Sequence, residues 1–146
     1  MGRGDWTDTP SEKLSDEYIV PICGIDLAKT VTRPEDLQNG PLIRILGQEA
    51  DWVRYFAAHE IAMPTGVSEY FVDTMTAAIE LAAIGGGYAV VIKRLVDMAN
   101  AARPRVGVVG EAVPIPNAHY LMRPRSKRSK RPEVLLFENW LREEFS

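Results

Sequence analysis

The sequence predicts an α/β fold. Short β-rich runs alternate with helical runs along the whole chain, which indicates a mixed or parallel sheet flanked by helices. Its 146 residues are 46% apolar and 25% charged, the composition and size of an ordinary globular domain. The lone cysteine, Cys23, excludes both an internal disulfide framework and a cysteine-based zinc site. The core must therefore come from packed apolar side chains.

The first elements are short. Residues 17–22 (EYIVPI) predict a strand, in which Pro21 indicates either an edge or the end of pairing. A helical turn starts at Pro34, which is followed by acidic side chains that favour a helix start. Residues 42–46 predict a second strand, and residues 51–59 predict a helix. That helix has one aromatic face, made of Trp52, Tyr55 and Phe56.

The middle of the chain shows the clearest pattern. Residues 69–72 predict a strand, and Asp73 or Thr74 can cap the helix that follows. Three glycines, 85–87, separate this helix from a strand at residues 88–92. A phosphate-binding loop needs the opposite order, strand then glycines then helix, so Gly85 is interpreted as a helix C-cap and Gly87 as a tight entry into the strand. The apolar stripe of the helix is Met75, Ala78, Ile79 and Ala82.

The remaining elements follow the same alternation. A second helix carries Ile92, Leu95, Val96 and Ala99 on one face. After it we expect a strand at residues 106–109, a proline-rich connection at 113–117, a strand at 118–122 and a helix from Pro132. The last helix has Val134, Phe137, Leu141 and Phe145 on one side.

The charge distribution is uneven. The net charge is −3, but six of the 17 basic residues fall within residues 123–131. A solvated loop is the favoured interpretation, with nuclear import and phosphate binding as alternatives. The acidic remainder argues against a general nucleic-acid binder. Because no secretory signal and no run of about 20 apolar residues is present, we expect a cytoplasmic protein without a membrane segment.

No catalytic constellation is recognisable. The candidate nucleophiles Ser68, Ser126 and Cys23 lie outside any nucleophile-elbow motif, and neither His59 nor His119 has an evident partner by spacing. The sequence therefore predicts neither an enzyme nor a metal site, and it implies no cofactor. What remains is a helix start at Asp73 and Thr74, where free N–H groups favour an anion, although simple capping explains either residue alone.

Several segments share their order with one family. They are Gly4-Asp5-Trp6 before the EYIVP strand and Cys23; Pro34-Glu-Asp-Leu; Asp51-Trp52 with Phe56-Ala-Ala; residues 73–91; Ala118-His-Tyr-Leu-Met-Arg-Pro; and Arg131-Pro-Glu-Val with Phe137 and Trp140-Leu. Together they resemble the regulatory part of LysR-type transcriptional regulators, in particular the glycine-cleavage-activator-like branch. The resemblance covers nearly the whole chain.

The resemblance implies a fold like the type II periplasmic binding proteins, in which two α/β subdomains enclose an effector cleft. Residues 1–21 would be the end of the first subdomain and the crossing strand, residues 22–113 the second subdomain, and residues 114–146 the return strand, basic loop and C-terminal helix. In the family that helix packs on the first subdomain. The family's helix-turn-helix domain has no counterpart, so the chain is expected to be N-terminally truncated.

The resemblance also implies a function. The chain would be an effector-binding domain that senses a small molecule and contributes to homo-oligomerisation, without binding DNA itself. The implied effector-binding residues are Cys23, Gly24, Asp73 and Thr74. Family effectors are commonly small anions or aromatic acids, but the carboxylate of Asp73 would repel an anion, so the effector class stays open. The alternatives are a stand-alone small-molecule binding module of the same fold and a non-functional fragment.

Overall fold

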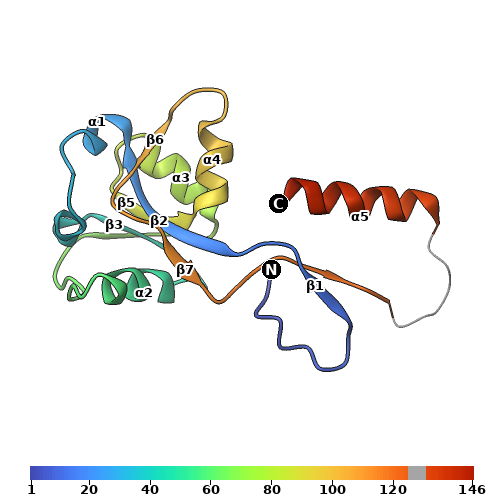
Figure 1. Cartoon of the computed structure of the whole chain (residues 1–146). Coiled ribbons are helices and arrows are strands. Elements are labelled where there is room, and N and C mark those ends of the chain that lie inside the picture. The colour runs from blue at the N-terminus through green and yellow to red at the C-terminus, as the bar shows by residue number, and fades with distance from the viewer. Residues whose placement is uncertain (125–130) are drawn as a thin grey trace. The chain divides into compact units, whose positions relative to one another are not determined.

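The computed structural model describes residues 1–124 and 131–146. Figure 1 shows the elements. In chain order they are β1 (Ser11–Lys13), β2 (Glu17–Gly24), α1 (Ile25–Ala28), the 3-10 helix η1 (Pro34–Asn39), β3 (Leu42–Ile45), α2 (Ala50–Ala58), β4 (Glu69–Val72), α3 (Met75–Ala83), β5 (Tyr88–Ile92), α4 (Lys93–Asn100), β6 (Val106–Val108), β7 (Val113–Ile115), β8 (Tyr120–Met122) and α5 (Pro132–Glu144).

The chain forms two compact units. Unit 1 contains residues 1–17 and 114–146, and unit 2 contains residues 18–113. The strands β2 and β7 cross from one unit to the other. The subdomain boundaries predicted above, after residues 21 and 113, concern the family's architecture and stay a prediction.

Unit 2 is built around a mixed sheet with the strand order β4-β3-β5-β2-β6. Strands β3, β4 and β5 are parallel, whereas β2 runs antiparallel to both β5 and β6. Helix α2 covers one face of this sheet, and α3 and α4 cover the other (Figure 1). The predicted α/β class with a mixed sheet is therefore confirmed.

Both faces of the sheet are packed. On the side of α3 and α4, the stripe predicted from the sequence is buried against strand residues such as Ile43, Ala89 and Val91. On the side of α2, the aromatic face is buried, and the indole N–H of Trp52 donates to the carbonyl of Ile43 at 3.0 Å. The periodicities thus correctly identified the buried faces of both helices.

The strand β2 is central, so the edge position that Pro21 could indicate is wrong. Pairing does not end there either, because the β5 register runs from Ile19 to Ile22 across Pro21; only the β6 register is limited to Ile22 to Gly24. In an antiparallel strand the N and the C=O of one residue face the same neighbour. The carbonyl of Pro21 accepts from the N–H of Val109, just beyond β6, so the missing N–H of the proline falls outside the ladder.

The glycines behave as predicted. Gly85 has a positive φ of +88°, and the N–H groups of Gly85 and Gly86 donate to the carbonyls of Ala82 and Leu81, which is the Schellman pattern of a helix end. A Cβ on Gly87 would collide with the backbone carbonyl of Pro41. These contacts join the end of α3 directly to β5.

Two features of the C-terminal part differ from the prediction. Residues 113–115, expected in an irregular connection, form β7, which pairs with β2. The strand β8 pairs with β1, a three-residue strand with no apolar pattern that could have predicted it. Most of the basic cluster, residues 125–130, lies outside the described residues.

Candidate functional site

The carboxyl ends of β3, β4 and β5 meet at one edge of the unit 2 sheet. From β3 the chain passes through α2 on one face to β4, and from β4 it returns through α3 on the other face to β5. The connection that leaves β3 therefore runs over one face, whereas the connections that leave its two neighbours, β4 and β5, run over the other. In open α/β sheets, ligands bind outside the carboxyl ends of the strands at such a switch point.

Asp73 and Thr74 lie at this edge, directly after β4. The hydroxyl oxygen of Thr74 accepts the N–H of Ala77 at 3.1 Å and so caps α3, which settles which of the two residues is the cap. Both side chains are exposed. At the end of β5, Lys93 begins α4 and forms an ion pair with Asp97 at 2.8 Å. The edge thus offers a carboxylate, a hydroxyl and the first N–H groups of a helix.

The other two predicted site residues, Cys23 and Gly24, lie at the opposite end of the sheet. In the sheet register, Cys23 lies level with the first residues of β3, β4 and β5, and its strand β2 is three strands away from β4. The standard spacings of a sheet put it roughly 20 Å from Asp73. The four predicted residues therefore occupy two places rather than one.

Neither residue at that end offers a side chain to a ligand. The thiol of Cys23 is fully buried, and burial raises its pKa to about 11. A Cβ on Gly24 would lie 3.2 Å from the carbonyl of Ala82, so the strand packs directly against the end of α3.

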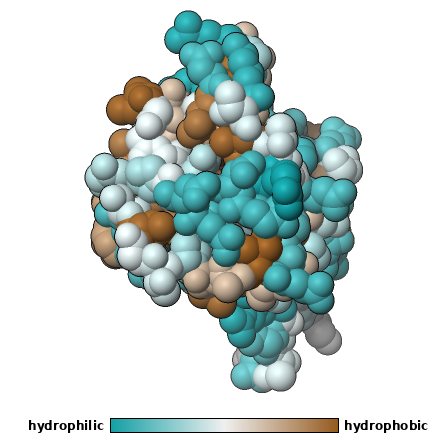
Figure 2. Space-filling model, turned by 90° about the vertical axis from the view of Figure 1, so that its left-hand side faces the viewer, coloured by the Kyte–Doolittle hydropathy of each residue, from teal (hydrophilic) through white to brown (hydrophobic). Residues whose placement is uncertain are grey.

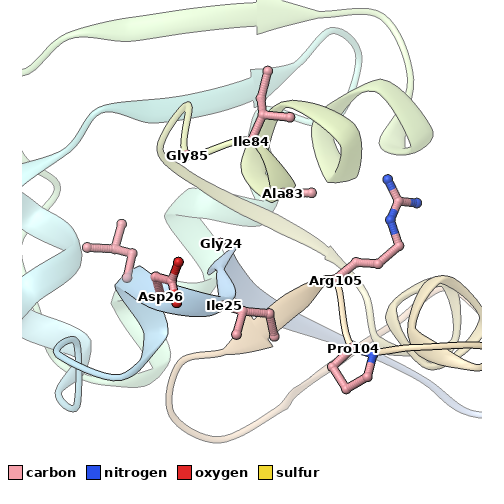
Figure 3. Close-up of a pocket in the computed structure, with 9 residues that line it drawn as sticks. Gly24, Ile25, Asp26, Ala83, Ile84, Gly85, Pro104 and Arg105 are labelled. Carbon is pink, nitrogen blue, oxygen red and sulfur yellow. The ribbon is translucent and has the colours of Figure 1, made fainter.

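Gly24 lines a hollow of about 590 Å³, bordered by α1, the last turn of α3 and the start of β6 (Figure 3). Its charged side chains already have partners. Arg105 forms two hydrogen bonds with Glu80, at 2.9 and 2.5 Å, and Asp26 accepts from Lys29 at 3.2 Å. The nine residues of α3 separate this hollow from Thr74.

A buried polar cluster in unit 1 was not predicted. Glu17 is 2% exposed, and its carboxylate accepts hydrogen bonds from the Ser15 hydroxyl at 2.6 Å and from Nδ1 of His119 at 2.8 Å. The serine and the imidazole thus bind the same carboxylate oxygen, and the Ser15 oxygen lies 3.3 Å from the same Nδ1. A serine hydrolase needs the hydroxyl and the carboxylate on different ring nitrogens, so this arrangement is not a catalytic triad.

No sequence signal could have revealed that cluster, because Glu17 and His119 are 102 residues apart. Glu17 is thus the partner of His119 that spacing along the sequence does not indicate. Within residues 1–124 and 131–146, no group of three metal-binding side chains comes together. In the same part of the chain, no helix is long and apolar enough to cross a membrane.

Comparison with known proteins identifies the family. The family model "LysR substrate binding domain" matches residues 1–146, and the chain belongs to this family. It is 32% identical over 135 residues to the HTH-type transcriptional regulator y4mQ of Sinorhizobium fredii, covering 90% of this chain and 44% of that protein. The chain therefore spans less than half the length of this relative. The family consists of regulatory effector-binding domains and not of enzymes.

Solved structures share the fold. The effector-binding domain of AmpR from Citrobacter freundii superposes with a TM-score of 0.77 at 22% identity, over 99% of this chain and 71% of that one. The full-length LTTR LysG of Corynebacterium glutamicum, solved with its effector Arg, has a TM-score of 0.67 at 13% identity, over 94% of this chain and 47% of that one. The chain is thus an effector-binding domain of the LysR type, with the periplasmic-binding-protein-like fold.

Proposed function

We propose that the chain senses a small molecule at the sheet edge marked by Asp73 and Thr74 and thereby controls transcription as part of a LysR-type regulator. The observation that carries the proposal is that the connection after β3 lies on one face and those after β4 and β5 lie on the other, with Asp73 and Thr74 exposed where these parallel strands end. Of the four residues predicted from the sequence, we propose that Asp73 and Thr74 contact the effector. Cys23 and Gly24 act from the other end of the sheet through packing.

The effector class is set by the charges at this edge. A helix N-terminus attracts an anion, whereas the Asp73 carboxylate attracts a cation or a hydrogen-bond donor. A ligand that carries both a carboxylate and an amino group would satisfy both. An amino acid is therefore the first class to test, ahead of simple carboxylates.

The test is a thermal-shift screen with free amino acids, small carboxylates and small amines. An amino acid that raises the melting temperature of the wild-type chain should lose most of this effect in Asp73→Asn. Asp26→Asn is the matched control. Asp26 is an exposed carboxylate on α1, and it lines the hollow beside the C-terminal end of α3. Equal shifts in both variants would contradict the proposed site. No shift with any compound would favour an incomplete binding site or a non-functional fragment.

We also propose that the chain forms a homo-oligomer through β4. This strand ends the sheet order, so its outer edge has backbone groups free to pair with another strand. Its Tyr70 and Phe71 are 48% and 58% exposed. Phe71→Lys should shift the sedimentation coefficient toward the monomer, whereas Ile84→Lys, at an exposed isoleucine elsewhere in the unit, should not. Unchanged sedimentation of Phe71→Lys would contradict the proposal.

The regulatory role rests on the longer relatives. We propose that this chain corresponds to the effector-binding part of a longer cytoplasmic protein of the glycine-cleavage-activator-like branch, and that a separate helix-turn-helix domain binds the DNA. The description of y4mQ as an HTH-type regulator and the ordered segments from Gly4 to Leu141 support this. The DNA upstream of the first codon tests it. An in-frame helix-turn-helix coding region is the expected result, and its absence would favour a stand-alone binding module.

A further inference from the structure

The helix α5 touches the rest of unit 1 through a charged contact. Arg142 donates two hydrogen bonds to the carboxylate of Glu12 on β1, from Nε at 2.7 Å and from Nη2 at 2.9 Å. Arg123, just after β8, donates to the same carboxylate at 2.8 Å. The hydrogen bonds from the Arg142 guanidinium and, to a smaller extent, from that of Arg123 lower the pKa of Glu12 to about 2. The carboxylate is therefore ionised at neutral pH.

The same face of α5 also reaches the buried cluster. Phe145 comes three residues after Arg142, so both side chains project from one side of the helix end. The ring of Phe145 packs on the imidazole of His119, with the ring centroids 4.7 Å apart. His119 is in turn the hydrogen-bond partner of Glu17.

Glu17 is the first residue of β2, the strand that continues into the sheet of unit 2. A buried carboxylate that loses a hydrogen-bond partner carries a large desolvation cost, so its position follows its partners. The contacts from Glu12 to Arg142, from Phe145 to His119 and from His119 to Glu17 form an unbroken series within unit 1.

We propose that α5 controls the position of Glu17, the first residue of the crossing strand β2. We call the Glu12–Arg142 contact that holds α5 the clasp. When the Glu12–Arg142 contact holds α5 in place, Phe145 fixes the imidazole of His119 and thereby the hydrogen bonds of Glu17. Displacing α5 frees the His119 ring and loosens β2 at its first residue. A partner or ligand that moves this helix can in this way act on the strand that leads into unit 2.

The test uses nuclear magnetic resonance of the intact chain, which has only two histidines. In Arg142→Gln, we expect amide hydrogen exchange in α5 and at Glu17 to become about tenfold faster. The ring signals of His119 should shift, and those of His59 in unit 2 should not. Lys93→Gln, which removes an ion pair on α4, is the matched control and should leave α5, Glu17 and His119 unchanged.

A second variant separates the two steps. Phe145→Ala keeps Glu12 and Arg142, so α5 should stay protected from exchange while the His119 signals and the Glu17 amide still change. If Arg142→Gln releases α5 without any effect on His119 or Glu17, the coupling is wrong. If Arg142→Gln leaves the exchange of α5 unchanged, the clasp itself is wrong. The unshifted His59 signals show in each case that unit 2 is folded.

Discussion

At the residue scale, Gly87 combines a positive φ with a close backbone contact. Its φ of +136° is one that side chains rarely adopt, and a Cβ there would overlap the carbonyl of Pro41, which accepts the N–H of Tyr88 at the start of β5. Gly87→Ala should therefore lower the free energy of unfolding by about 2–4 kcal/mol, measured by urea denaturation. Gly47→Ala is the control. Gly47 also has a positive φ, +81°, but has open space around it, so the loss should be about 1 kcal/mol. Equal losses in the two variants would show that the positive φ alone, and not the contact with Pro41, sets the loss of stability.

A second residue-scale prediction concerns Cys23 and alkaline pH. Burial raises the pKa of its thiol to about 11, so the folded protein keeps the proton while the unfolded chain releases it above about pH 9. The unfolded state then binds fewer protons, and stability falls as pH rises from 9 to 11. We expect a loss of about 1–2 kcal/mol in this window, seen in urea titrations at fixed pH.

The control for this prediction is Cys23→Ala, which should flatten the pH dependence between 9 and 10 and make it less steep between 10 and 11. Burial also raises the pKa of Tyr55, to about 12, so both proteins should lose stability above pH 10. If the wild type and Cys23→Ala respond identically from pH 9 upward, the thiol is not the cause.

At the element scale, periodicity was a reliable guide wherever one helix face is buried. The stripe from Met75 to Ala82 and the aromatic face around Tyr55 could both be predicted from the sequence, because buried residues of a helix recur every three to four positions. The strand β1 was not readable, since its residues Ser11–Lys13 pair only with β8, 107 to 111 residues away in the register. The family resemblance likewise grouped Cys23 with Asp73 in one site, and only the sheet register shows that they lie at opposite ends of the sheet.

The helix α5 carries its own prediction. Arg142 and Phe145 contact the rest of unit 1, whereas the exposed apolar side chains of α5 include Leu136 at 70%, Phe137 at 56% and Trp140 at 50%. The rings of Phe137 and Trp140 are stacked, with centroids 5.6 Å apart. In contrast, the face of the molecule drawn in Figure 2 shows hydrophobic side chains mostly as separate spots among hydrophilic ones. A contiguous exposed patch of this kind promotes association.

We therefore expect the apparent mass in light scattering to rise with protein concentration. Phe137→Glu should reduce this rise, and it should leave thermal stability nearly unchanged because Phe137 is largely exposed. Ile84→Glu, at an isolated isoleucine that is 82% exposed, is the control and should have little effect. A monomer at every concentration would contradict the prediction.

At the scale of the whole molecule, the two units differ in how they are held together. The largest buried cluster, which includes Ile22, Ile43, Ile79 and Val91, comes entirely from residues 20–106, within unit 2. Unit 1 is held by the β1–β8 ladder, the Glu12 contacts and the buried Glu17 cluster. Since the burial of apolar surface is the main driving force of folding, unit 2 should carry its own stability.

This difference predicts that a chain of residues 18–113 folds without unit 1. Trp52 reports on it directly, because it is the unit's one tryptophan in the sequence and is 2% exposed. Its fluorescence should stay that of a buried indole, and the free energy of unfolding should lie within about 1–2 kcal/mol of the value that Trp52 reports in the whole chain. The matched reference is the whole chain with Trp6→Phe and Trp140→Phe, in which Trp52 is again the single probe. A fragment with exposed-indole fluorescence and no cooperative transition would show that the crossing strands need unit 1 to complete the sheet.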